Sequence, residues 1–146
     1  MSADIQEQEF IGNPEKCKIS QTKLDLSILL LKAKDCLSNA GKIAQQYDFC
    51  KIVEGVLCIK DCKNNGLCFV RHAWNYDTND DIYFDATTIL DEEEFNQVGQ
   101  YEYTYYKCCE YTLDYAVKNK KANGFQFAYK ELINFFKSYI KIQEHG

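Results

Sequence analysis

The chain has 146 residues, the size of one domain, and a formal net charge of −5. Aromatic residues make up 14% of the sequence, a content that suits a packed core and argues against disorder. Because the balance is acidic and no basic run is longer than the one in KNKK, a phosphate-binding surface is disfavoured and we expect no nucleic-acid partner.

The first twenty residues are polar and contain Gly12 and the single proline, Pro14. We expect residues 1–20 to form a loosely held, flexible segment in front of one domain at 21–146. The opening residues, MSADIQEQEF, have neither the basic nor the apolar region of a secretory signal. The longest apolar run, ILLL, is far shorter than a membrane span, so we expect no membrane partner.

Two stretches of helical periodicity follow. Leucines recur at helical spacing in TKLDLSILLLKAK (22–34), and apolar residues lie three to four apart in DCLSNAGKIAQQY (35–47). Asp35 occupies a possible N-cap position for the second stretch. Either one helix runs over 22–47 or a break near Lys34 separates two helices, and we favour the break.

An antiparallel meander is predicted after the helices. CKIVEGVLCIK (50–60), LCFVRHAW (67–74) and IYFDATT (82–88) have the composition and alternation of strands, and the intervening DCKNNG and NYDTNDD are typical of turns. In QYEYTYYKCCEYTL (100–113), polar and aromatic residues alternate, which predicts a fourth strand.

Two further helical segments complete the pattern. The acidic run LDEEEF (90–95) indicates the solvated start of a helix rather than a metal site, and FQFAYKELINFFKSYIKI (125–142) has one aromatic and aliphatic helical face. The order of helices, strands and helix predicts an α+β domain, with N-terminal helices packed on an antiparallel sheet and a C-terminal helix.

One hairpin brings a histidine and an aspartate together. If the chain turns at residues 77–80, Tyr76 pairs with Asp81 and His72 directly faces Asp85. Opposed residues have Cβ atoms roughly 4.5–5.5 Å apart, close enough for a carboxylate to fix the tautomer of an imidazole. A slip of one residue would separate the pair. The alternative is a cross-strand ion pair without chemistry.

A histidine–aspartate pair needs a nucleophile, and the chain has eight cysteines. Without a signal peptide, and in a chain larger than a secreted mini-domain, we expect reduced thiols and a cytoplasmic protein. Cys36 has the best local context, because the amides of a helix start favour a thiolate and can donate to an oxyanion. Any single cysteine of the eight is otherwise expected to be structural.

The order of DCLSNA, IVEG, RHAW and FDAT over residues 35–87 resembles small bacterial and phage proteins of the transglutaminase-like and papain-like superfamily. Those proteins show a Cys-x-x-Asn-Ala helix start, a Val-Glu-Gly strand, a His-Ala-Trp strand and an Asp-Pro-Thr strand. This chain departs from the pattern at DAT, where the proline is absent, and in lacking a Gly or Pro breaker before Cys36.

The resemblance implies a papain/transglutaminase-like fold and a cysteine hydrolase or acyltransferase that acts on an amide or thioester. By position, Cys36 would be the nucleophile, His72 the general base and then acid, and Asp85 the orienting residue. Asn39 and Glu54 fall in matching segments, where they can support the site or be structural. No cofactor is implied, and the substrate class is open among proteins, peptides and small acyl compounds.

Three alternatives remain open from the sequence. Trp74 beside the pair can shield it from water or simply belong to the core. Cys58-x3-Cys62-x5-Cys68-x3-His72 has the look of a zinc site, although extended strands would hold such ligands apart. A third interpretation is a catalytically inert module that binds a protein or peptide through its tyrosine- and tryptophan-rich surface.

Overall fold

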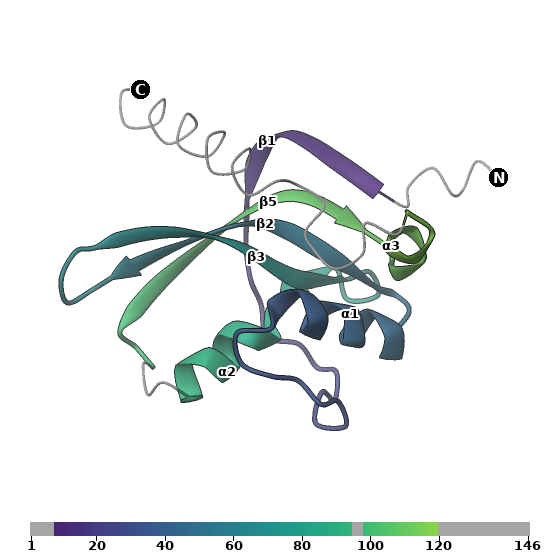
Figure 1. The fold of residues 1–146 in the computed structure, drawn as a ribbon, viewed down its shortest axis with the longest axis horizontal. Coiled ribbons are helices and arrows are strands. Elements are labelled where there is room, and N and C mark those ends of the chain that lie inside the picture. Colours follow the sequence, from purple (N-terminus) through teal and green to yellow (C-terminus); the bar gives the residue numbers. More distant parts are fainter. Residues whose placement is uncertain (1–7, 95–97, 120–146) are drawn as a thin grey trace.

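The computed structural model describes residues 8–94 and 98–119. This part of the chain is an α+β fold, in which an antiparallel sheet carries short helices (Figure 1). Its elements in chain order are β1 (Gln8–Cys17), α1 (Cys36–Gln46), β2 (Cys50–Asp61), β3 (Leu67–Asp77), β4 (Ile82–Phe84), α2 (Ala86–Glu94), β5 (Tyr101–Tyr111) and α3 (Leu113–Asn119). The predicted α+β class and the predicted strands β2, β3 and β5 are confirmed.

The sheet has the strand order β1-β5-β2-β3-β4, and every neighbouring pair is antiparallel. β2 lies between β3 and β5, so the strand after α2 returns to the centre of the sheet instead of extending the meander beyond β4. The two edge strands, β1 and β4, are linked where the chain leaves β1. Ile19 bridges to Tyr83, and the Ser20 amide donates to the Tyr83 carbonyl at 2.7 Å, so the sheet curls around one face.

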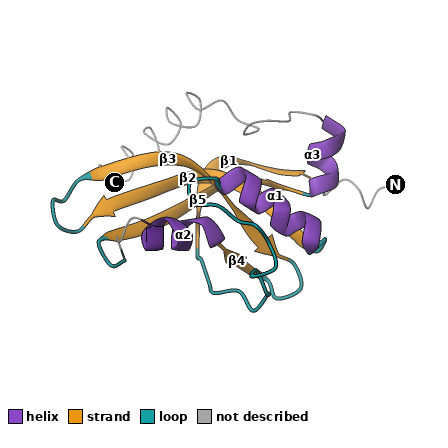
Figure 2. Ribbon diagram, turned by 60° about the horizontal axis from the view of Figure 1, so that its bottom comes forward, coloured by secondary structure: helices purple, strands orange, loops and turns teal. Residues whose placement is uncertain are grey.

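The two faces of the sheet bury different clusters. The inner face of the curl holds Trp74, Val53, Leu57 and Tyr105. On the other face, α1 packs its alanines against the sheet, in a cluster of Ala40, Ala44, Ile52, Ala73, Cys109 and Tyr111. Figure 2 shows α1 lying across the strands, with α2 and β4 at the same edge of the sheet. A hydrogen bond also holds α1 against β3, because Asn75 Nδ2 donates to the carbonyl of Ala40 at 3.0 Å.

The break predicted near Lys34 is confirmed, but the helix predicted before it is wrong. Lys34 has a φ of 63°, a left-handed conformation that a helix does not contain, and α1 begins two residues later. Residues 22–34 run as turns and irregular backbone, and Asp25 turns the chain by accepting hydrogen bonds from the amide and hydroxyl of Ser27. The leucines of this segment still reach the core, where Leu24, Leu26, Leu29 and Leu31 pack around Ile43, Cys50 and Phe84.

The third predicted strand is only partly correct. Of IYFDATT, residues 82–84 form β4, and the chain then turns into α2 at Ala86. Asp85 causes the change, because its Oδ1 accepts the amides of Thr87 at 3.0 Å and Thr88 at 3.3 Å, the pattern of a helix N-cap. The acidic run at 90–94 is therefore the end of this helix and not its start.

Three predictions remain: a loosely held N-terminal segment, a C-terminal helix and the absence of a membrane span. Residues 1–20 are predicted to be loosely held, but residues 8–17 form β1, paired with β5. The helix predicted at 125–142 lies outside the described residues. Among the helices that the structure describes, none has the length and apolar character needed to cross a bilayer.

Candidate active site

Cys36 is the first residue of α1, so the structure places this thiol at a helix start. The side chain of Asp35, the N-cap residue, makes no capping hydrogen bond. The amide of Asn39 bonds to the Asp35 carbonyl at 2.9 Å, which closes the first helical turn. The Asp35 side chain therefore accepts no hydrogen bond from the first-turn amides of Cys36 and Leu37, and these amides can donate to an anion.

His72 and Asp85 form a buried pair, with Nε2 and Oδ2 2.8 Å apart. The predicted register is off by two residues, because Tyr76 pairs with Tyr83 and not with Asp81. If this register continued, Asp85 would lie opposite Trp74 and diagonal to His72. A shift of two keeps the pair on one face, so the contact forms even though direct pairing does not.

The thiol of Cys36 lies beside the imidazole of His72 and, after Asp85, contributes to raising the pKa of the ring. Because Nε2 of the ring already faces Asp85, Nδ1 is the nitrogen left for the sulfur. β4 ends opposite Asn75, so the edge of β3 near His72 is not covered by β4 and lies where α1 and α2 begin. Cys36, His72 and Asp85 thus come from a helix start, a strand and a helix cap, and they meet in one chain of contacts.

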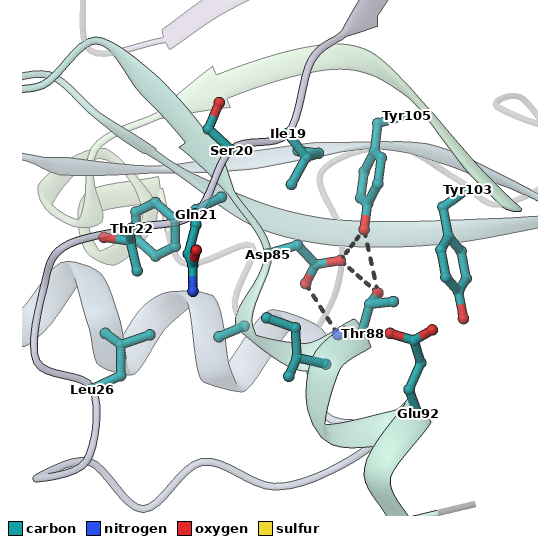
Figure 3. Close-up of a pocket in the computed structure, with 13 residues that line it drawn as sticks. Ile19, Ser20, Gln21, Thr22, Leu26, Asp85, Thr88, Glu92, Tyr103 and Tyr105 are labelled. Atoms are coloured by element: carbon teal, nitrogen blue, oxygen red, sulfur yellow. Dashed lines mark hydrogen bonds between the residues drawn. The ribbon is translucent and has the colours of Figure 1, made fainter. Parts of the chain in front are cut away.

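Asp85 is held by more than the histidine. Its Oδ2 accepts the hydroxyl of Tyr105 at 2.6 Å and that of Thr88 at 2.5 Å, in addition to the His72 contact (Figure 3). Its Oδ1 caps α2 through two backbone amides. Both oxygens are therefore fixed by donors from β5 and α2, which orients the carboxylate toward the ring.

The protonation states follow from burial and pairing. His72 is 6% exposed and Asp85 is 5% exposed. Burial alone lowers the pKa of His72, but the charge and hydrogen bond of Asp85 outweigh it and raise the pKa to about 10. Burial alone would raise the pKa of Asp85, and His72, Thr88 and Tyr105 together hold it below its usual value. The ion pair of imidazolium and carboxylate is the favoured state at neutral pH.

Trp74 and Gly55 build the wall behind the histidine. The Trp74 and His72 rings stack with centroids 6.0 Å apart, and Trp74 is 1% exposed, so the indole keeps water from that side of the imidazole. Gly55 is the β2 register partner of His72. A Cβ atom there would lie 2.0 Å from the carbonyl oxygen of Tyr106 and 2.9 Å from the Trp74 ring, so only glycine fits this strand position.

Asn39 supports the site from a distance. Its side chain exchanges two hydrogen bonds with the backbone of Lys32, at 3.0 and 2.7 Å, and donates to the Thr87 hydroxyl at 2.8 Å. It therefore ties the segment before Cys36 to the helix that Asp85 caps. Glu54 is fully buried and accepts a short hydrogen bond from the Tyr111 hydroxyl, on the side of the sheet that α1 covers.

Sequence reasoning missed Thr88 and Tyr105, the two hydroxyl donors to Asp85. Thr88 had a weak signal, since Asp85 before it is a residue type preferred at helix N-caps. The alternation of IYFDATT instead predicts a strand there. Tyr105 had none, because it is one of eleven tyrosines and nothing in the sequence places it opposite Asp85.

None of the eight cysteines, all of which lie in the described residues, forms a disulfide. Within residues 8–94 and 98–119, no three His, Cys, Asp or Glu side chains gather in a way that would hold a metal ion. The zinc interpretation of Cys58, Cys62, Cys68 and His72 is not supported by this geometry, and the imidazole it would use is paired with Asp85 and Cys36.

Searches of protein-family models, curated proteins and solved structures returned no match to this chain.

Proposed function

We propose that the protein is a cysteine hydrolase or acyltransferase acting on an amide or thioester, with Cys36 as nucleophile, His72 as acid and base, and Asp85 as orienting residue. One observation carries the proposal: a thiol at a helix start lies beside an imidazole whose Nε2 is held by a buried carboxylate. The order of helix, histidine strand and aspartate also supports a papain/transglutaminase-like scaffold.

The proposed reaction starts from the thiolate form of Cys36 and the imidazolium form of His72. The Cys36 thiolate attacks the carbonyl carbon, and the imidazolium of His72 gives its proton to the leaving nitrogen or sulfur as that bond breaks. A thioester of Cys36 and a neutral imidazole remain. Water, or an amine in a transferase, then loses a proton to His72 and attacks the acyl carbon. The C–S bond breaks, which restores the thiolate and the imidazolium.

Two features support the transition state. The first-turn amides of α1 point toward the helix start, where an oxyanion would form beside Cys36, and the Asp35 side chain does not cover them. Asp85 holds the ring in the tautomer that presents Nδ1 to the sulfur, and its full set of donors keeps it ionised. Removal of one oxyanion donor or of the orienting carboxylate typically costs about 10²–10⁴ in rate.

Two exposed cysteines of the chain can serve as reference thiols in a test of the nucleophile. Cys62 and Cys68 are exposed, whereas Cys36 is half-buried, so accessibility alone would make Cys36 the slower thiol. We expect iodoacetamide at pH 7 to alkylate Cys36 faster than either, by up to about thirtyfold, because a free thiol is only a few per cent thiolate at this pH. Peptide mass spectrometry gives the rate at each cysteine.

The His72→Ala variant completes this experiment. It should bring the rate at Cys36 down to or below that of the exposed thiols, with Cys62 and Cys68 unchanged. Equal rates at all three cysteines in the wild type would reject Cys36 as the nucleophile.

Turnover distinguishes an enzyme from an inert scaffold. Incubation with N-acetylcysteamine thioesters of short acyl chains should add the acyl mass to the Cys36 peptide, and the adduct should decay in water as free acid appears. In His72→Ala the adduct should not accumulate above the level on Cys62. If Cys36 is alkylated rapidly and yet no acyl group is transferred from thioesters or peptide amides, the proposed reaction is wrong.

A further inference from the structure

A cavity of about 500 Å³ opens beside Asp85, at the mouth of the curled sheet. Its walls come from the segment that follows β1, from the junction of β4 and α2, and from β5 (Figure 3). This volume lies within the range of small-molecule sites. Cys36 and His72 are not among its lining residues, so the cavity is separate from the thiol and shares only the carboxylate side of the triad.

The chemistry of the walls is acidic and aromatic. Among the described residues that line the cavity, two are carboxylates, Asp85 and Glu92, and none is Lys, Arg or His. Ile19, Leu26, Phe84 and Ile89 supply apolar surface, while Tyr103 and Tyr105 supply rings with hydroxyl groups. An anion would be repelled by the Glu92 carboxylate and would find no cation among the lining residues, and a neutral apolar ligand would leave the polar groups unpaired.

The two carboxylates differ in what they can still accept. Asp85 already receives five donors, from two amides, two hydroxyls and the His72 ring, and the histidine balances its charge. Glu92 is half-buried at the other side of the cavity, where Tyr103 also lines the wall. Burial and the charges of Glu92 and Asp91 raise the pKa of Tyr103 to about 12, so this hydroxyl stays a neutral donor. Glu92 is thus the acceptor without a balancing cation among the lining residues.

We propose that this cavity binds a small organic ammonium compound, with its charged nitrogen at Glu92 and over the Tyr103 ring and its apolar body against Ile19, Leu26 and Phe84. The nitrogen donates to the Glu92 carboxylate and gains cation–π attraction from the tyrosine. The apolar body displaces water from the hydrophobic part of the wall. This site does not depend on the proposed reaction, because no step of it uses Cys36.

Three compounds of similar shape and different charge test the proposal: phenethylamine, 2-phenylethanol and 3-phenylpropionate. Binding is measured by titration calorimetry and saturation-transfer NMR on the full chain carrying Cys36→Ala, so that the failure of the proposed reaction cannot affect the result. We expect phenethylamine to bind at least about tenfold more tightly than 2-phenylethanol, and 3-phenylpropionate not to bind.

Matched variants locate the site. Glu92→Gln should weaken phenethylamine binding by at least about tenfold, and Glu94→Gln should leave it unchanged. Glu94 lies on the same helix and carries the same charge, but it is exposed and does not line the cavity. Equal binding of the amine and the alcohol, no binding of the amine at about 10 mM, or an equal effect of the two variants would each overturn the proposal.

Discussion

Two buried carboxylates, Asp85 and Glu110, are each paired with a different kind of cation. This difference distinguishes the proposed reactive site from a structural network. Asp85 is paired with His72 at 2.8 Å and accepts the hydroxyl of Tyr105. Glu110 is 3% exposed, is paired with Lys107 at 3.0 Å and accepts the hydroxyl of Tyr83 at 2.9 Å. Each network joins a carboxylate, a cation and a tyrosine. Only the first contains an imidazolium, a cation that can pass its proton to a leaving group and take it back during a reaction.

The thiols beside the two networks differ in the same way. Cys36 begins a helix and lies beside the imidazole. Cys17, at the end of β1, lies near Trp74 and Glu110, and burial raises the pKa of its thiol to about 11. Lys107 gives the Glu110 carboxylate a partner of fixed charge, which is a structural role. His72 instead lies between the Asp85 carboxylate and the Cys36 sulfur. The pair of networks therefore provides an internal control for the proposed site.

The largest expected difference is in the stability lost when each carboxylate is neutralised. Asp85→Asn should destabilise the fold by about 3 kcal/mol, because it leaves His72 without its partner in a nearly dry site. Glu110→Gln should cost only about 1 kcal/mol, because the side chains of Lys51 and Lys107 are 21% and 12% exposed and can be hydrated. Urea unfolding at pH 6 measures both. A larger loss in Glu110→Gln would reverse the comparison.

Gly55 lies between the two networks, and a side chain at this position should disturb the network of Asp85 and His72. It is the register partner of His72 on β3 and of Lys107 on β5. Gly55→Ala would push its methyl group against the Tyr106 carbonyl and the Trp74 ring, so we expect a loss of about 2 kcal/mol. Gly41→Ala is the control, since nothing lies within 4 Å of a Cβ there. Thermal unfolding and tryptophan fluorescence would detect both changes, and a Gly55→Ala variant as stable as wild type would show that the strand yields easily.

Stability should also depend on pH through the first network. The folded pKa of His72, about 10, lies above its ordinary 6.5, so its contribution is complete below pH 6.5 and is lost as the pH rises through about 10. The pKa of Asp85 lies below its ordinary 3.8, so its contribution is complete above pH 3.8 and is lost at lower pH. The stability difference between wild type and Asp85→Asn should therefore be largest between about pH 4 and 6.5 and shrink toward pH 10. A difference that stayed constant from pH 6 to 10 would contradict the raised pKa.

The sequence predicted the members of the first network better than its geometry. Cys36, His72 and Asp85 were identified from local context and from the two-residue alternation of a hairpin. The register was wrong by two residues because Asp77 turns the chain with its own side chain, which accepts the amides of Asn79 and Asp80. The closing pair is then Asp77 with Ile82.

Other errors have a different physical cause, because contacts outside the local window decided the structure. The leucines of 22–34 have helical spacing, but they bury themselves on Ile43 and Phe84 from an irregular backbone. The Glu110 network was not predicted at all, because Lys51, Tyr83 and Glu110 come together only through the strand order. Long-range pairing of this kind leaves no periodic signal in one sequence.

The smallest expected effect compares the two tyrosines. Tyr105→Phe removes one donor to Asp85 and Tyr83→Phe removes one donor to Glu110, and each should cost about 1 kcal/mol or slightly more in stability. Their consequences for Cys36 should differ. Without Tyr105, Asp85 loses a hydrogen bond that favours its ionised form, so His72 is held less firmly and alkylation of Cys36 should slow about twofold to tenfold. Tyr83→Phe should leave that rate unchanged, because its network contacts neither the imidazole nor the sulfur in the described contacts. If both variants slowed Cys36 equally, the effect would come from loosening of the sheet as a whole, and the separate roles assigned to the two carboxylates would not stand.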